Sequence, residues 1–143
     1  MRNLFQIFIA ALLLTVGSLS ARAQKFSTMS ENERNAKLTQ IALKVYKAKK
    51  FSKYYSNYGY SGKYEITPFN KGVDENDKAS IERDKILGKL QYIVKLYSKP
   101  GAKWGSFTIA KVYVSDRSGK AWSIMFGNDN MVYSYWNCPE PFK

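Results

Sequence analysis

Residues 104–136 constrain the fold of this chain most, because they predict three β-strands joined by two tight turns. β-Branched and aromatic residues concentrate in the predicted strands, which span residues 107–114, 121–126 and 131–136. The turns at 116–119 and 127–130 are rich in Gly, Asp and Asn, the residues that tolerate a positive φ. Strands joined by such short turns pair in antiparallel fashion. The segment therefore predicts an antiparallel β-meander.

Both faces of this meander carry apolar side chains. On the first strand Thr108, Ala110, Val112 and Val114 alternate with Phe107, Ile109, Lys111 and Tyr113; on the second, Trp122, Ile124 and Phe126 alternate with Ala121, Ser123 and Met125. Because successive side chains of a strand point to opposite faces, both faces need cover. We expect helices on one face, and a partly covered or open aromatic surface on the other.

Residues 28–50 predict the first helix. Apolar residues recur at helical spacing at Leu38, Ile41, Ala42 and Val45. Ser30 followed by Glu33 matches a capping box, in which each side chain satisfies a free backbone N–H group at the helix start.

Residues 74–98 fit two patterns. A helical arc joins Ala79, Ile86, Leu87, Leu90, Ile93, Val94 and Tyr97 and ends before Pro100 and Gly101. However, Leu90, Tyr92, Val94 and Leu96 also alternate as in a strand, and Gly88 is a possible helix end. We favour one long helix and keep a fourth strand at 89–97 as the alternative. The predicted fold is thus α+β, with two amphipathic helices packed on a small antiparallel β-meander of three to four strands.

The first 23 residues have the three parts of a signal peptide: basic Arg2, an apolar run over 4–16, and Ala21-Arg22-Ala23 before the cut. We expect cleavage between Ala23 and Gln24, which leaves residues 24–143 as a single domain. The apolar run is shorter than the roughly 20 residues of a transmembrane helix. The sequence therefore predicts an exported protein, periplasmic or secreted, whose mature chain has no transmembrane span.

Charge and cysteine content narrow the choice of partners. The full chain has a net charge of +12, which falls by two when Arg2 and Arg22 leave with the signal peptide. Such a charge favours an anionic glycan, a lipid headgroup or an acidic protein, and export argues against nucleic acid. The lone Cys138 cannot form an internal disulfide, and a small buried apolar role suits it best.

Tyrosines and lysines alternate between residues 50 and 64, in a segment with one short predicted strand at 64–67 that ends at Pro68. Rigid amphipathic rings beside cations suit the binding of an anionic partner. The candidate binding surface comprises Lys50, Lys53, Tyr54, Tyr55, Tyr58, Tyr60, Lys63 and Tyr64. Two alternatives remain open: these rings cover the second face of the sheet, or they line a site. Trp104, Trp122 and Trp136 could also stack on sugars, although Trp in a meander is usually a core residue.

The residue types exclude several kinds of chemistry. The chain has no His, which removes His-based triads, His-ligated zinc and the usual general base near neutral pH. Asp116 and Asp129 fall in turns, where Asp serves the backbone. We therefore expect no metal, no cofactor and no catalysis. The sequence predicts a small, envelope-associated binding domain; the alternative is a periplasmic inhibitor or immunity protein directed against an exported enzyme or toxin.

Overall fold

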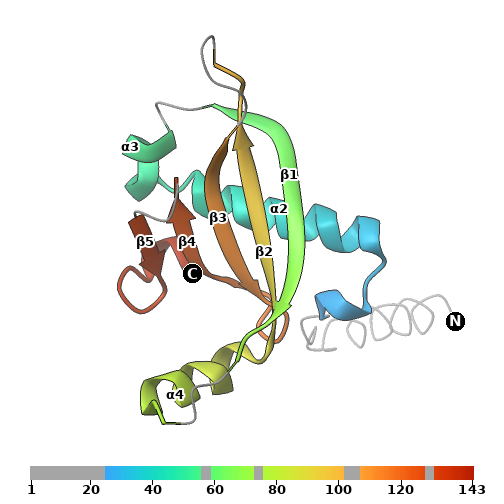
Figure 1. The fold of residues 1–143 in the computed structure, drawn as a ribbon, viewed down its shortest axis with the longest axis vertical. Coiled ribbons are helices and arrows are strands. Elements are labelled where there is room, and N and C mark those ends of the chain that lie inside the picture. The colour runs from blue at the N-terminus through green and yellow to red at the C-terminus, as the bar shows by residue number, and fades with distance from the viewer. Residues whose placement is uncertain (1–24, 56–58, 73–75, 102–106, 128–130) are drawn as a thin grey trace, which may run out of the picture.

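The computed structural model describes residues 25–55, 59–72, 76–101, 107–127 and 131–143. Within these residues the fold is α+β, with three α-helices and a five-stranded antiparallel sheet (Figure 1). The helices are α2 (Glu31–Tyr46), α3 (Ser52–Tyr55) and α4 (Lys78–Leu87), with short 3₁₀ turns η2 (Phe26–Thr28), η3 (Lys49–Phe51) and η4 (Glu140–Phe142). The strands are β1 (Tyr60–Asn70), β2 (Leu90–Ser98), β3 (Thr108–Ser115), β4 (Ala121–Phe126) and β5 (Met131–Ser134).

The predicted signal peptide lies outside the described residues, so cleavage between Ala23 and Gln24, and export itself, stay predictions. Among the helices that the structure describes, none is long and apolar enough to cross a membrane.

The sheet is a simple meander in which each strand pairs with the next, in the order β1-β2-β3-β4-β5. The three C-terminal strands occur where residues 104–136 predict them, and Gly119 in the β3–β4 turn has the expected positive φ of 67°. The predicted count of three to four strands is wrong, because β1 and β2 extend the sheet to five.

Strand β1 is longer than the predicted strand at 64–67 and continues past Pro68 to Asn70. Proline has no N–H group to donate and is tolerated on an edge strand, where one side of the backbone needs no partner. Since β1 pairs only with β2, its other edge is free of ladder bonds within the described sheet. Pro68 therefore does not end the strand, contrary to the sequence prediction.

The favoured long helix over 74–98 is also wrong, and the strand alternative is correct. Helix α4 ends at Leu87, because Gly88 turns the chain with φ 71° and ψ 173°. Side chains from other segments satisfy the carbonyl groups at this helix end: Arg117 donates to Lys85 O at 2.7 Å, and the Ser115 hydroxyl donates to Leu87 O at 2.6 Å. The chain then enters β2, whose side chains alternate between buried and half-exposed.

Helix α2 is the cover for one face of the sheet and lies behind the strands in Figure 1. One half of its predicted capping box forms, with Ser30 accepting a hydrogen bond from the Glu33 N–H group at 3.4 Å, whereas the Glu33 carboxylate pairs with Lys37 at 3.0 Å. Its buried side chains share one core with alternate residues of the central strands: Leu38, Ala42, Val45 and Tyr46 meet Val94, Leu96, Ala110, Val112, Val114, Ile124 and Phe126. Helix α4 lies at one end of the sheet (Figure 1) and has only Leu87 buried. One amphipathic helix, not two, therefore packs across the sheet.

A buried carboxylate joins the N-terminal segment to the β3–β4 turn. Asp116, which is 6 % exposed, accepts hydrogen bonds from Ser27 N at 2.8 Å and from the Ser27 hydroxyl at 3.0 Å. These bonds hold η2 in place, so that Phe26 packs edge-on against Tyr92 at a centroid distance of 6.0 Å. Asp116 thus has a structural role, consistent with its position in a turn.

Candidate functional site

The surface predicted over residues 50–64 is divided in the structure. Tyr58 lies outside the described residues, and Tyr55 ends α3. Lys50, Lys53, Lys63 and Tyr64 are exposed, and Tyr60 is half-buried against the core. That these residues bind a partner stays a prediction.

Tyr54 packs inward. Its ring stacks on Phe126 at a centroid distance of 4.5 Å and an interplanar angle of 17°. Its hydroxyl group shares a 2.6 Å hydrogen bond with that of Tyr133, and Lys53 Nζ lies 4.9 Å from its ring centroid. The bond to Tyr133 lowers the pKa of Tyr54 and raises that of Tyr133. Tyr54 therefore packs against the core on the α2 face of the sheet, and not over the second face that the cover alternative specified.

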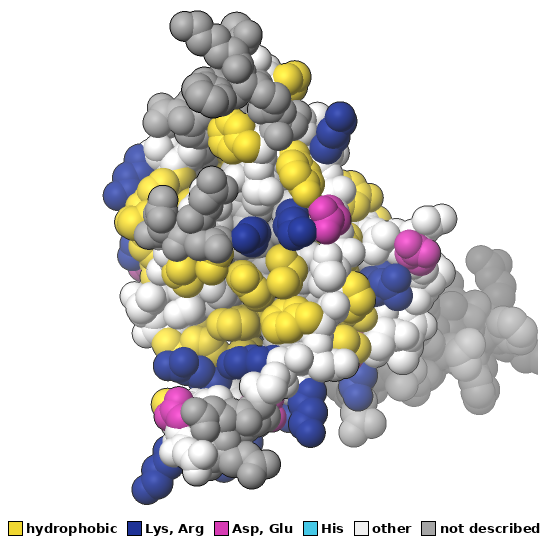
Figure 2. All heavy atoms as spheres, viewed as in Figure 1, with side chains coloured by type: hydrophobic (Ala, Val, Ile, Leu, Met, Phe, Trp, Pro, Cys, Tyr) yellow, Lys and Arg dark blue, Asp and Glu magenta, His cyan; other side chains and the backbone are white. Residues whose placement is uncertain are grey.

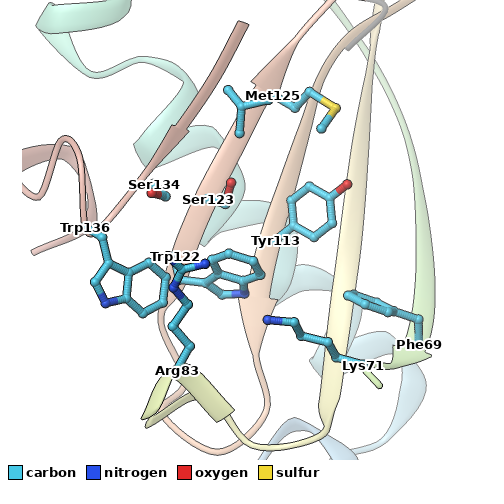
Figure 3. Close-up of a pocket in the computed structure, with 10 residues that line it drawn as sticks. Phe69, Lys71, Arg83, Tyr113, Trp122, Ser123, Met125, Ser134 and Trp136 are labelled. Carbon is cyan, nitrogen blue, oxygen red and sulfur yellow. The ribbon is translucent and has the colours of Figure 1, made fainter. Parts of the chain in front are cut away.

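The face of the sheet opposite α2 carries a groove of about 410 Å³ (Figures 2 and 3). Its lining residues come from β1, α4, β3, β4, β5 and the segments after β1 and β5: Phe69, Lys71, Arg83, Tyr113, Trp122, Ser123, Met125, Val132, Ser134 and Trp136. Figure 2 shows hydrophobic side chains gathered on this face, with Lys and Arg side chains above and below them. The volume falls in the range of about 300–1,000 Å³ that is typical of ligand pockets.

Four rings form an aromatic strip across the groove: Phe69, Tyr113, Trp122 and Trp136 (Figure 3). The centroids of successive rings are 6.1, 5.6 and 5.8 Å apart. The interplanar angles are 81°, 53° and 68°, so the rings meet edge to face or tilted rather than stacked. The strip therefore crosses the sheet from edge strand β1 to the segment that follows edge strand β5.

Two cations accompany the two indole rings. Lys71 Nζ lies 5.6 Å from the Trp122 ring centroid, and Arg83 Cζ lies 5.3 Å from that of Trp136. Both distances are within the range of cation–π attraction. Among the described residues that line the groove, none is acidic. The groove therefore presents aromatic surface and positive charge together.

A β-bulge places Trp122 in the groove. Tyr113 pairs with Ser123 but Val114 pairs with Ala121, so Trp122 is the extra residue on β4. The indole N–H group donates a 2.6 Å hydrogen bond to Gln91 Oε1, and the Gln91 amide donates to Gly88 O at 3.0 Å. Gln91 is 0 % exposed. The predicted alternation put Trp122 on the same face as Ile124; the bulge turns it to the open face instead.

A polar cluster borders the groove further along the strands. Lys95 and Lys111 are direct neighbours on β2 and β3, and Lys111 pairs with Met125 of the groove. Glu65 accepts hydrogen bonds from Lys95 Nζ and from the Tyr97 hydroxyl, each at 2.8 Å. These bonds lower the pKa of Glu65 and raise the pKa values of Lys95 and Tyr97. This border carries more positive than negative charge.

Sequence reasoning identified part of the groove. It named Trp122 and Trp136 as residues that could stack on sugars, and it predicted a partly covered or open aromatic surface on the second face of the sheet. Trp104 lies outside the described residues. Sequence reasoning missed Phe69, Lys71 and Arg83, because no local pattern marks these residues as neighbours of the two indole rings.

The described lining of the groove offers aromatic rings, two cations and hydroxyl groups. Within the described residues no three His, Cys, Asp or Glu side chains are grouped so as to hold a metal ion. The groove hydroxyl of Ser123 is engaged, donating to Tyr133 O at 3.0 Å. Cys138 is buried, as the sequence suggested, and is a free thiol. No protein-family model matches this chain, and neither curated proteins nor solved structures give a significant match.

Proposed function

We propose that this protein is an exported, non-catalytic binding domain whose groove on the open face of the sheet takes an anionic ligand. The observation that carries the proposal is the aromatic strip with Lys71 and Arg83 over its indoles, in a groove whose described lining has no acidic residue. The net charge, +12 for the full chain and two lower once Arg2 and Arg22 leave with the predicted signal peptide, attracts anions over a longer range. The predicted signal peptide supports export.

Physical chemistry favours an anion at these cations. A cation–π contact at an exposed site stabilises by only about 0.5–1 kcal/mol. Lys71 and Arg83 keep N–H groups with which to donate charge-assisted hydrogen bonds, which are roughly twice as strong as neutral ones. Aromatic side chains add contact area while losing little conformational entropy. A ligand with a flat apolar surface and a negative group therefore satisfies both halves of the groove.

The test is a calorimetric titration of the mature protein with matched charged and neutral probes. The pairs are oligogalacturonide against cello-oligosaccharide, and phosphatidylglycerol against phosphatidylcholine vesicles. We expect at least one anionic probe to bind, its neutral match to bind at least tenfold more weakly, and added salt to weaken the binding.

Three variants locate the site. Arg83→Gln should weaken binding about fivefold, the equivalent of roughly 1 kcal/mol, whereas Lys44→Gln on the exposed side of α2 removes the same charge without effect. The double variant Lys63→Gln, Tyr64→Ala tests the surface predicted over residues 50–64. The groove proposal fails when no anionic probe binds, when Arg83→Gln and Lys44→Gln weaken binding equally, or when only the Lys63 and Tyr64 double variant loses it.

A second candidate is the inhibitor or immunity protein, and one observation favours it. Large apolar side chains are exposed on β5 and just after it: Met131 (41 %), Val132 (48 %), Tyr135 (46 %) and Trp136 (38 %). Exposed apolar groups beside an edge strand suit a protein interface. This function requires that an enzyme or toxin from the same envelope loses activity at a stoichiometric amount of this protein, and that Val132→Asp relieves the inhibition. An activity that stays constant across all such enzymes would exclude it.

A further inference from the structure

The aromatic strip is elongated and crosses the strands, which limits the shape of the ligand. Its four rings come from β1, β3, β4 and the segment after β5, in three centroid steps of 6.1, 5.6 and 5.8 Å. A peptide added to the sheet would run along an edge strand, parallel to β1 or β5. A ligand that contacts all four rings must instead lie across the strands.

Resting on the proposed function of the groove, we infer that its ligand is a linear acidic polysaccharide, whose sugar rings lie along the aromatic strip and whose carboxylates meet Lys71 and Arg83. The axial C–H face of a pyranose is apolar and packs on an aromatic ring, while its equatorial oxygens stay in water. Such a ligand needs a row of rings along an open surface rather than a closed apolar cavity. The groove is a part-open hollow with such a row along it (Figure 3).

The positions of the cations match a charge on consecutive units. Lys71 accompanies Trp122 and Arg83 accompanies Trp136, and these two rings are neighbours at a centroid distance of 5.8 Å. One pyranose unit of a linear chain is comparable in length to the spacing between strands, which is roughly 4.8 Å. Neighbouring units therefore reach neighbouring rings, and a polymer with one carboxylate per unit offers one anion to each cation.

Other anionic ligands fit the groove less well. An acyl chain favours an enclosed aliphatic cavity, whereas the only aliphatic side chains among the described lining residues are Met125 and Val132. An acidic protein surface needs an interface of about 20–30 residues on each partner, which is more than the ten described residues that line the hollow. Single-stranded nucleic acid also stacks on aromatic rings beside cations, but the predicted export argues against it. Because single-stranded nucleic acid fits the rings and cations, oligothymidylate is one of the probes in the experiment below.

The test measures how affinity depends on ligand length, with oligogalacturonides of one, two, four and six units at constant salt. We expect affinity to rise at least tenfold from one unit to about four, because the strip offers four rings, and then to level off. Trp136→Ala should remove most of this rise, lowering the affinity for the longer chains about tenfold or more. Trp136 is 38 % exposed, so the variant should fold, and its far-UV circular dichroism and melting temperature verify this. Tetrameric cello-oligosaccharide, which has no carboxylate, should bind at least tenfold more weakly.

The outcomes separate this inference from the proposed function. If one unit binds as tightly as four, or if Trp136→Ala leaves the length dependence unchanged, the linear chain is wrong, although an anion still binds the groove. If oligothymidylate or phosphatidylglycerol vesicles bind more tightly than the hexamer through Arg83, the polysaccharide is wrong while the groove remains the site. If none of these anions binds, the proposed function fails as well.

Discussion

Gln91 provides a sharp test of how the groove is built. Its side chain is fully buried, accepts a hydrogen bond from Trp122 Nε1 at 2.6 Å, and donates one to Gly88 O at 3.0 Å. Gln91→Met keeps a long unbranched side chain but leaves both partner groups unpaired. A buried polar group that loses its partner costs about 1–3 kcal/mol.

The net effect is smaller than the sum of the two costs. Trp122 is only half-buried, so water restores part of the lost bond to its N–H group, and methionine gains some apolar burial. We expect the free energy of unfolding to fall by about 2 kcal/mol. For a chain of this size each kcal/mol moves the melting temperature by roughly 3–5 °C, so the expected fall is about 6–10 °C.

Urea and thermal unfolding followed by far-UV circular dichroism measure this change without relying on Trp122 fluorescence. Gln40→Met is the matched control, since Gln40 is exposed on α2, and it should stay within about 0.5 kcal/mol of the wild type. A double-mutant cycle with Trp122→Phe isolates the bond between the two side chains, with an expected coupling of about 1 kcal/mol. The reasoning is refuted if Gln91→Met behaves like Gln40→Met, or if the two substitutions are additive.

Three further predictions concern stability. Asp116→Ala should cost about 2–3 kcal/mol in urea unfolding, because it leaves the Ser27 N–H and hydroxyl groups without their charged acceptor; a loss below 1 kcal/mol would contradict this. Gly88→Ala should cost about 1–3 kcal/mol, because φ 71° with ψ 173° suits only glycine, whereas Gly72→Ala, with open space around it, should be nearly neutral. Since the pKa of Glu65 is lowered in the fold, the stability that its charge contributes is complete above the usual Glu pKa of about 4.3 and is lost as pH falls through the lower folded value. The difference in melting temperature between wild type and Glu65→Gln should therefore shrink between pH 6 and pH 3, and a constant difference would count against the ion pair.

The parts of the fold that were predicted correctly depend on local patterns. The β3, β4 and β5 strands are runs of β-branched and aromatic residues bounded by short turns. Helix α2 has both its N-cap residue and its apolar stripe within its own sequence. The prediction of one long helix over 74–98 was wrong because the apolar residues of this segment do recur at helical spacing. Its true end at Gly88 depends on hydrogen bonds from Ser115 and Arg117, about thirty positions further along the chain. No window around residue 88 contains those partners.

The candidate site was harder to predict because it depends on register and on distant neighbours. The sequence placed the binding surface where tyrosines are dense, yet Tyr54 stacks on Phe126, which lies far away in the chain. Trp122 reaches the groove through a bulge that only the pairing of β3 with β4 defines. Arg83 meets Trp136 because the bonds at the end of α4 fix that helix beside the sheet. Each of these contacts depends on tertiary structure that a single-sequence pattern does not encode.

Stability alone does not account for the open face of the sheet. A solvated face is best built from polar and β-branched residues whose neighbours across the strands attract each other. Here Lys95 and Lys111 are direct neighbours on β2 and β3, and Glu65 forms an ion pair with Lys95 at 2.8 Å. The four rings of the aromatic strip lie beside them, on a face that α2 does not cover. Positive charge and ring surface on the same uncovered face both become favourable when an anionic ligand occupies the groove, which is why we place function on this face rather than on the tyrosine segment.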